Sequence, residues 1–476
     1  MDLPPDLRQA ISSTGGAKVA LVLGAGCSVE APTGLPVSSS ISQEIHRLLV
    51  ADGVLKNGDC TDPTDLSLVA DAVFCKTHSQ RAVVERFRER YDLKLATPNR
   101  GYYIAAAMLC EGAISSVVTL NFDLALSTAL SELGAGQIVG VVERPEDLPL
   151  QKAINIYYLH RNVNAADPEL WVLRTAALAE EWRGHWEPII ANRVLTAPVV
   201  VFAGLGTPVA VLIESTRLLR EALMGTRRIY QADPGEREDS KFFGALNIDP
   251  AAYLQCGWGE LMEEFSRRLS LEQVAQLRDA IDRKVREDRL EAEDVSCFVN
   301  RFESLGLVKL GKLRASWLLH DKPYCPVDSS ASGLLADLVL ALAMLARVSG
   351  ALPVVADDGV VEFHRDGQAV SSYLIASGRG YRGRPAIEAR IESRSPDHRS
   401  RAAPPRGVLV GGTSDAWDVP TTPPKDILQG DQIEEDLVSG PMTLPLIHID
   451  ELRRNQDLIQ KLVPWPTIHT VLRSQI

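Results

Sequence analysis

Short apolar segments alternate with amphipathic ones along the first 270 residues, and this alternation constrains the fold more than any other feature of the sequence. The apolar segments are rich in β-branched residues, which predicts strands buried on both faces of a sheet. The amphipathic segments repeat apolar residues about every three to four positions, which predicts helices. Strands are predicted at residues 18–23, 115–120, 154–159, 198–204 and 227–231, and helices at 38–50, 80–91, 123–133, 209–223 and 259–269.

The predicted fold class is therefore α/β, with a Rossmann-like, mostly parallel sheet and helices on both of its faces. The character of the chain changes near residue 270, where a charged helical stretch begins. We predict a first domain at 1–270 and a smaller α/β accessory domain at 271–476, with helices first and a small sheet after them. Asp366-Gly367 lies between two apolar segments and predicts a hairpin with a type I′ turn, because both residues tolerate positive φ.

Composition excludes several classes of protein. Hydrophobic residues make up 45% of the 476 residues and charged residues 24%, which is typical of packed domains. The formal net charge of -12 provides no general attraction to nucleic acid, so we predict no direct nucleic-acid binding. The N-terminus lacks a secretory pattern, which predicts a cytoplasmic protein. The apolar run from Leu338 to Ala346 is shorter than the ~18 residues that cross a bilayer, so it predicts a buried helix and no membrane association.

We predict no bound metal. The seven cysteines are scattered and never form C-x-x-C, so neither a disulfide framework nor a zinc ribbon is expected. Asp357, Asp358 and Asp366, with the segment IEARIE at 387–392, match a magnesium nuclease poorly, because the lysine expected after the glutamate of such sites is missing.

Glycines and polar residues follow several predicted strands. Gly24 and Gly26 come directly after the first strand, where absent side chains let a diphosphate approach the backbone. An ordinary dinucleotide fingerprint would place a third glycine at the position of Val29, so a tight turn is the alternative. Asn121 follows the second strand and His160 the third. Because parallel strands end at one edge of a sheet, we expect these residues to form one pocket.

Four motifs occur in the order found in the sirtuin family. Gly24-Ala25-Gly26 with Ser28, followed by Gly34-Leu35-Pro36, resembles the family's GAGxS…GIP nucleotide loop. The other matches are Thr119, Asn121 and Asp123 to the T-x-N-x-D motif, His160 to the catalytic histidine, and Gly204, Gly206 and Thr207 to the glycine-rich ribose and phosphate loop. Over roughly residues 15–270, the chain resembles the divergent sirtuin-like NAD-cleaving domains of bacterial anti-phage defence proteins.

This resemblance implies an NAD glycohydrolase that releases nicotinamide and ADP-ribose, with NAD as substrate and no zinc. It implies catalytic roles for Asn121, His160 and Asp123. The residues implied to hold NAD are Gly24, Ala25, Gly26, Ser28, Gly34, Thr119, Gly204, Gly206 and Thr207. It further implies an effector of abortive infection that forms a homo-oligomer. Activation would come through the C-terminal domain, whose role is regulation, oligomerisation or docking, or through a partner such as an ATPase or a nucleic-acid-sensing subunit.

The sequence also departs from the family. The segment between Ser28 and Gly34 is two residues longer than in typical sirtuins, and Val37-Ser38 replaces the usual Phe-Arg. Arg161 replaces a glycine and Pro208 a serine, which leaves a catalytically inactive nucleotide-binding sensor or structural subunit as the alternative function. A third alternative, protein deacylation, is disfavoured because the four-cysteine zinc module is absent.

Single residues also have ordinary structural explanations. Asp123 can cap the following helix, and we weigh that role equally with ligand contact. An isolated histidine at the position of His160 would be interpreted as a surface residue, and only the order of the motifs favours catalysis. Cys27 lies within the loop without a visible base, so packing is favoured over a nucleophilic role.

Overall fold

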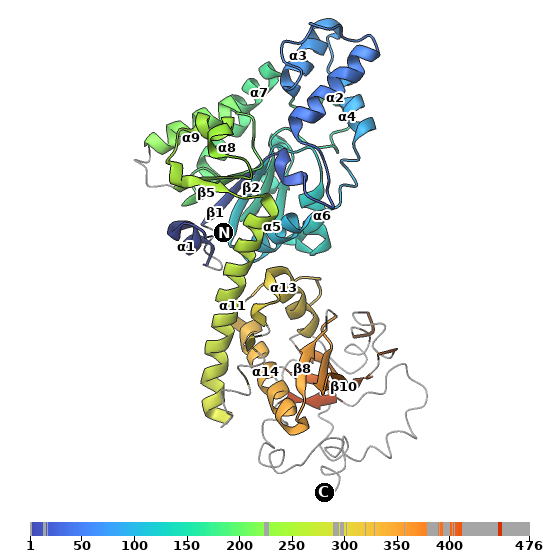
Figure 1. Cartoon of the computed structure of the whole chain (residues 1–476), viewed down its shortest axis with the longest axis vertical. Coiled ribbons are helices and arrows are strands. Elements are labelled where there is room, and N and C mark those ends of the chain that lie inside the picture. The colour runs from blue at the N-terminus through green and yellow to red at the C-terminus, as the bar shows by residue number, and fades with distance from the viewer. Residues whose placement is uncertain are drawn as a thin grey trace, which may run out of the picture. The chain divides into compact units, whose positions relative to one another are not determined.

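The structure is a computed structural model of the chain, and it divides into two compact units, Met1–Leu269 and Ser270–Ile476 (Figure 1). The residues that it describes are 2–12, 16, 18–222, 228–288, 295, 299–300, 302–318, 320–327, 329–356, 358–377, 389, 391–393, 400–401, 403, 405–411 and 446–449. Asp357 and three of the six residues of the segment 387–392, which were compared with a nuclease site, lie outside the described residues.

The first unit contains a seven-stranded sheet in the order β3-β4-β2-β1-β5-β6-β7. Every neighbouring pair is parallel. The strands are β1 (Val19–Leu23), β2 (Ile114–Thr119), β3 (Val139–Val142), β4 (Ile154–Tyr158), β5 (Val199–Ala203), β6 (Arg228–Asp233) and β7 (Tyr253–Gln255). The parallel sheet confirms the predicted α/β fold class, and the carboxyl ends of β4, β2, β1 and β5 lie in consecutive order.

Helices cover both faces of this sheet. On one face, Val22, Tyr157 and Phe202 pack in a cluster with residues of α8, α9 and α10. Because side chains alternate along a strand, Tyr158 faces the other way, where its hydroxyl bonds Ser127 of α6 at 2.8 Å. The helices are α1 (Pro5–Ile11), α2 (Ser38–Ala51), α3 (Leu66–Thr77), α4 (Arg81–Arg90), α5 (Arg100–Cys110), α6 (Ala125–Glu132), α7 (Thr175–Glu181), α8 (Glu187–Arg193), α9 (Ala210–Ala222), α10 (Lys241–Leu246) and α11 (Trp258–Asp288).

Helices α2, α3 and α4 form an insertion between β1 and β2 with a core of its own. Ile45 of α2, Val73 of α3 and Val84 of α4 are fully buried in that core. Phe122 and Trp171, which follow β2 and β4, pack against the same cluster. The insertion is thereby attached to the loops at the carboxyl edge of the sheet.

Some elements were not predicted. Helix α5 was missed because residues 101–110 are all buried except Tyr103, so the segment has no polar face to reveal a helical period. Strands β3 and β7 have four and three residues, too few to show a pattern. The residues predicted as separate helical stretches before and after residue 270 form one helix, α11, of 31 residues.

The second unit has helices followed by a smaller sheet, as predicted. Its strand order is β12-β11-β10-β9-β8, and the elements are α13 (Gly306–Trp317), α14 (Ser329–Ser349), β8 (Leu352–Val355), β9 (Val361–Arg365), β10 (Gln368–Ser377), β11 (Pro405–Gly411) and β12 (Leu446–His448). Strands β9 and β10 are antiparallel, and Asp366 and Gly367 between them have φ of 52° and 79°, which confirms the predicted hairpin turn.

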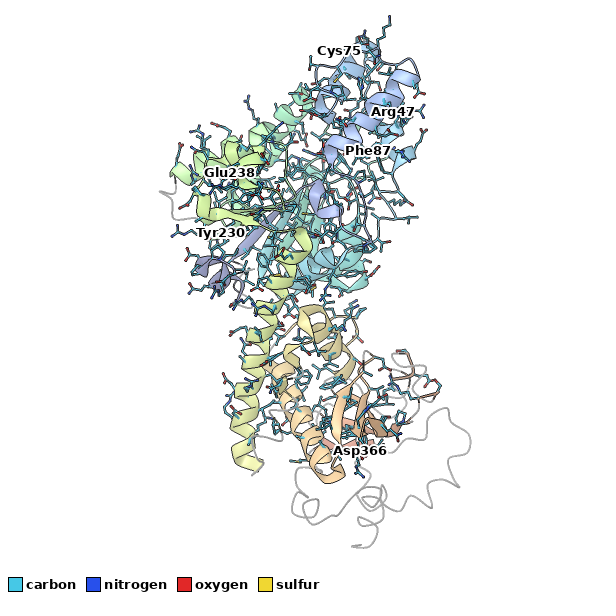
Figure 2. All side chains as sticks on the ribbon, viewed as in Figure 1. Arg47, Cys75, Phe87, Tyr230, Glu238 and Asp366 are labelled. Atoms are coloured by element: carbon cyan, nitrogen blue, oxygen red, sulfur yellow. The ribbon has the colours of Figure 1, made fainter. Side chains whose placement is uncertain are left out.

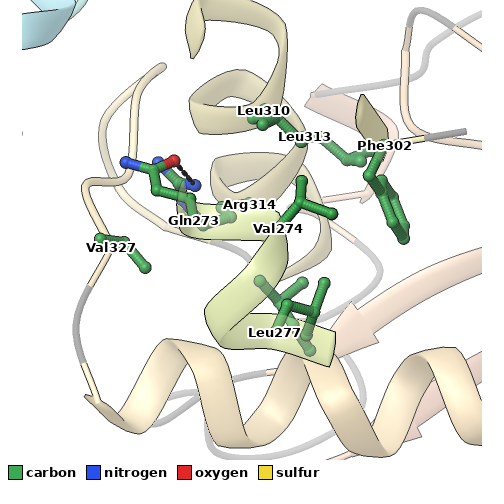
Figure 3. A pocket seen from close by; sticks show the side chains of 9 residues that line it. Gln273, Val274, Leu277, Phe302, Leu310, Leu313, Arg314 and Val327 are labelled. Carbon is green, nitrogen blue, oxygen red and sulfur yellow. Dashed lines mark hydrogen bonds between the residues drawn. The ribbon is translucent and has the colours of Figure 1, made fainter. Parts of the chain in front are cut away.

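Helix α14 contains the apolar run that was predicted to be buried, and Leu338, Leu340 and Leu342 are indeed inaccessible to solvent. A buried guanidinium lies in the second unit, where Arg314 donates to the Gln273 side chain at 2.9 Å (Figure 3). Arg314 also donates to the carbonyl of Cys325 at 2.8 Å. Within the described part of the chain, no helix has the length and apolar character needed to span a bilayer.

The ends of β1 and β5 meet through their glycines. Gly24 N donates to the Ala203 carbonyl at 2.9 Å, and Gly26 N donates to the Gly204 carbonyl at 3.0 Å. A Cβ on Gly26 would lie 2.7 Å from Gly204 Cα. Gly204 itself has a φ of +66°, and its Cβ would lie 2.5 Å from Cys27 N. Only glycine fits at these positions without moving one strand end away from the other.

We predict that Gly204→Ala lowers the free energy of unfolding of the full chain by about 2–4 kcal/mol. Alanine is disfavoured in the left-handed conformation of this residue, and its Cβ would also clash with the backbone of Cys27. Gly244→Ala in α10 is the control, since a Cβ there meets nothing within 4 Å and alanine favours helix. Urea unfolding followed by circular dichroism measures both variants, and equal stability of the two would contradict the explanation.

Candidate active site

A cavity of about 440 Å³ lies at the carboxyl edge of the first unit's sheet. This volume is within the range of small-molecule sites, about 300–1,000 Å³. Its walls come from the loops after β1, β2, β4 and β5 and from the helices α2, α3, α4, α7 and α9. The sequence-predicted residues that line it are Gly24, Ala25, Ser28, Asn121, Asp123, His160, Gly204, Gly206 and Thr207.

Three of the predicted residues lie outside the lining. Gly26 does not line the cavity, and its N–H joins the loop after β1 to the carbonyl of Gly204 after β5. Gly34 has a φ of +62° and closes the turn that returns the chain to Leu35 and the cavity. Thr119 is buried at the end of β2, where its hydroxyl accepts from Asn121 N at 3.1 Å. In the structure, Thr119 therefore contacts the neighbouring site residue and does not face the cavity.

A buried hydrogen-bond network joins four side chains at the cavity wall. Ser28 Oγ donates to Asp123 Oδ2 at 2.8 Å and lies 2.7 Å from the Tyr102 hydroxyl. Asn121 Nδ2 donates to Ser28 Oγ and to the Tyr102 hydroxyl, both at 3.1 Å. Because the only proton of Ser28 goes to Asp123, Tyr102 must donate to Ser28.

This network fixes the orientation of the Asn121 carboxamide. Both hydroxyls have already donated their protons, so only the amide nitrogen of Asn121 can satisfy them. None of the described residues donates to Asn121 Oδ1, and the residue lines the cavity. The network thus presents a carbonyl oxygen to whatever occupies the cavity. Tyr102 was not predicted as a site residue, because it lies in the wholly apolar-looking sequence of α5 and carries no motif signal.

Asp123 is nearly inaccessible and has two partners. Burial raises the pKa of Asp123, while hydrogen bonds from Ser28 and from the backbone N–H of Ala125 lower it. The Ala125 bond, at 3.0 Å, shows that Asp123 also caps the first turn of α6. Burial and the nearby Asp123 carboxyl raise the pKa of Tyr102 well above its usual range, so its hydroxyl keeps its proton at neutral pH. Asp123 therefore anchors the network to the start of α6.

His160 lines the cavity two residues after the end of β4. Burial lowers the pKa of His160 from 6.5 to about 4, and a hydrogen bond with the Leu120 backbone opposes this shift. Its ring lies 5.9 Å from the ring of Phe122. At neutral pH the imidazole is uncharged and can accept a proton.

Aromatic side chains form the wall next to His160. Phe122 stacks on Trp171 with ring centroids 4.7 Å apart. Phe87 of α4, which is labelled in Figure 2, meets Phe122 edge-on at 5.4 Å. Phe87 and Phe122 both line the cavity. The inserted helices therefore close one side of the site with apolar surface.

The opposite wall offers backbone donors. Val209, Ala210 and Val211, at the start of α9, line the cavity, where the first N–H groups of a helix have no intrahelical partner. Among the described residues that line the cavity, none is lysine or arginine. An anionic group would thus be held by neutral N–H donors of α9 and the glycine loops.

Two of the four departures from the sirtuin-like motifs, Pro208 and Arg161, lie at the cavity or next to a residue that lines it. Pro208 lines the cavity just before α9, where it offers neither an N–H nor a hydroxyl. Arg161 has a φ of +68°, a conformation that costs a non-glycine residue roughly 1–2 kcal/mol. Its guanidinium pairs with Glu181 of α7 at 2.8 Å. This ion pair ties the residue after His160 to α7, whose Leu178 lines the cavity.

Cys27 packs under the loop. Its thiol is buried and donates to the Ala203 carbonyl at 3.4 Å. Burial raises the pKa of Cys27 well above its usual range, which disfavours the thiolate that a nucleophile requires. No cluster of His, Cys, Asp and Glu suited to a metal ion occurs among the described residues.

Comparisons with known proteins give distant structural likenesses only. No protein-family model and no curated protein matches the sequence. A solved Sir2 homologue in complex with NAD is 15% identical, with a TM-score of 0.34, and the match covers 56% of this chain and 94% of that one. A Sir2 homologue mutant in complex with ADP-ribose is 16% identical, with a TM-score of 0.34 and coverage of 56% and 96%. At these values the likeness assigns no activity to the chain.

We predict that Tyr102→Phe lowers the free energy of unfolding by about 1–3 kcal/mol, because Asn121 loses one buried acceptor and Ser28 one donor. Tyr230→Phe on β6 (Figure 2) is the control, because Tyr230 lies outside the network. Urea unfolding of the full chain measures both. Equal effects would show that the Tyr102 hydroxyl contributes nothing specific to the fold.

His160 should make stability depend on pH. Its folded pKa is lowered from 6.5 to about 4, so between these values the unfolded chain binds the proton more readily. Stability is then lost as pH falls through this window, by on the order of 2–3 kcal/mol. We predict that His160→Gln removes this loss, whereas His185→Gln at an exposed site does not. Urea unfolding at several pH values tests this, and identical profiles for wild type and His160→Gln would contradict it.

Proposed function

We propose that the chain is an NAD glycohydrolase that releases nicotinamide and ADP-ribose. The main support is the pairing of an oriented Asn121 carbonyl with an uncharged His160 in one cavity. The second support is the order of the sirtuin-like motifs along the sequence. Glycine loops and the first turn of α9 offer the N–H donors that a diphosphate needs.

The proposed chemistry uses groups that the cavity contains. Breaking the bond between nicotinamide and ribose leaves positive charge on the anomeric carbon, as in other glycosidic cleavages. Nicotinamide takes the bonding electrons and leaves as a neutral molecule. Asn121 Oδ1 accepts a hydrogen bond from the attacking water, and His160 accepts the proton that this water loses. The water oxygen forms the new bond to the ribose, which gives ADP-ribose.

The biological setting is also proposed. The resemblance to anti-phage domains supports an effector of abortive infection, activated through the second unit or a partner protein. A nucleotide-binding subunit without turnover remains the main alternative, and it is favoured by Pro208 in the cavity lining and by Arg161 directly after His160. Protein deacylation would require an acyl-lysine peptide for every NAD consumed.

We predict that Asn121→Ala and His160→Ala each lower nicotinamide release at least ~100-fold, because each removes a group that acts on the water. The matched controls are Asn57→Ala and His185→Ala, both at exposed positions. Nicotinamide and ADP-ribose are measured by mass spectrometry in cells that express the full chain together with the proteins encoded beside it. Unchanged release in both site variants would reject the catalytic assignment, and ADP-ribose binding without any turnover in wild type would favour the binding subunit.

A further inference from the structure

Glu30 lies in the segment between Ser28 and Gly34, which is two residues longer than in typical sirtuins, and it contacts the start of α11. Glu30 Oε1 accepts a hydrogen bond from Gly259 N at 2.8 Å. A Cβ on Gly259 would lie 2.3 Å from Glu30 Oε2, and a Cβ on Gly257 would lie 3.2 Å from Oε1. Two glycines therefore make room for the carboxylate, which lies at the favourable end of the helix dipole.

Trp258, between these two glycines, contacts α5. Its indole is buried, and Nε1 donates to Asn99 Oδ1 at 3.3 Å. A Cβ on Gly101 would lie 2.2 Å from that nitrogen, so this glycine makes room for the indole. The Trp258 ring lies 5.8 Å from the ring of Tyr102.

The contacts made by Glu30 and Trp258 are each connected to the buried hydrogen-bond network at the cavity wall. Asn99 Nδ2 donates to the Cys27 carbonyl at 2.8 Å, so Trp258 reaches the nucleotide loop through one residue. The Tyr102 hydroxyl bonds both Ser28 and Asn121. Glu30 holds the same loop from its other side. The first turn of α11 thus contacts Tyr102 directly and reaches the loop that carries Ser28 through Glu30 and Asn99.

We propose that Glu30 and Trp258 are positioning residues, through which the first turn of α11 holds the nucleotide loop and the Asn121 carbonyl in place. The longer segment between Ser28 and Gly34 then has a purpose, because it carries Glu30 to the helix. Helix α11 runs on to Asp288, past Ser270 where the second unit begins, and we propose that this covalent connection is the route by which the second unit controls the site. Only that control of NAD cleavage rests on the proposed function.

A merely structural role and a positioning role predict different results. If these residues only stabilise the fold, their loss lowers stability and leaves the kinetic constants of the folded fraction unchanged. If they position the site, Glu30→Ala raises the KM for NAD by displacing the loop. Trp258→Phe then lowers kcat, because Tyr102 no longer holds Asn121 in one orientation.

The first experiment is hydrogen–deuterium exchange of the full chain, which needs no activity. We expect exchange across residues 24–35 to be about ten times faster in Glu30→Ala and Trp258→Phe than in wild type. Glu260→Ala changes an exposed acid in the same turn and should leave this exchange unchanged. Glu30→Gln keeps an acceptor for Gly259 N and should restore most of the protection. Exchange in Glu30→Ala equal to that in Glu260→Ala would overturn the proposal.

The second experiment is kinetic and uses the variant pair at Trp258 and Tyr102. We expect Trp258→Phe and Tyr102→Phe each to lower kcat about tenfold, and the double variant to be no slower than Tyr102→Phe alone, because both act through one hydroxyl. Tyr230→Phe on β6 controls for the Tyr102→Phe substitution, because Tyr230 lies outside the hydrogen-bond network. Multiplying effects in the double variant would overturn the route through Tyr102. If wild type releases no nicotinamide, the proposed function fails, while the exchange experiment still decides the positioning role.

Discussion

The backbone contact between the ends of β1 and β5 is the constraint on which the rest of the site depends. Gly24 and Gly26 donate to the carbonyls of Ala203 and Gly204, so the two loops that leave these strands start in contact. Side chains at Gly26 or Gly204 would collide with the opposing backbone and separate the loops. With the loops together, the start of α9 and the turn after β1 face the same cavity, and an anion can be held by N–H donors without a lysine or arginine.

The buried polar network gives this edge of the sheet a single arrangement. Each of its hydroxyls has one proton, and the chain of donors runs from Asn121 through Tyr102 and Ser28 to Asp123. A buried polar group that lacks a hydrogen-bond partner costs about 1–3 kcal/mol of stability, which is more than one typical hydrogen bond contributes. Because both hydroxyls are paired with the Asn121 amide nitrogen and with each other, the orientation of Asn121 is a property of the fold.

The sequence allowed the sheet of the first unit to be predicted, because strands buried on both faces leave continuous apolar runs such as residues 199–203. The sequence also allowed Asn121 and His160 to be placed at one edge of this sheet, because parallel strands end on the same side. The contribution of Tyr102 could not be predicted, since a hydroxyl in an apolar helix gives no sign of its partner 19 residues away. The contact between Glu30 and Gly259 could not be predicted either, because the two residues lie 229 positions apart in the sequence. Only the folded chain shows that the absence of side chains at Gly257 and Gly259 leaves room for the Glu30 carboxylate.

The protonation of His160 depends on whether the cavity is occupied, and this dependence bears on the proposed catalysis. An imidazole whose pKa is lowered to about 4 is a weak base at neutral pH, because the surrounding protein does not solvate its charged form. An anion in the cavity acts in the opposite direction, since a nearby negative charge stabilises the imidazolium and raises the pKa. The same apolar wall of Phe87 and Phe122 that weakens the base also strengthens this interaction by excluding water. His160 is thus a stronger base when the cavity holds a diphosphate than when it is empty, which agrees with the proposed cleavage of a bound dinucleotide.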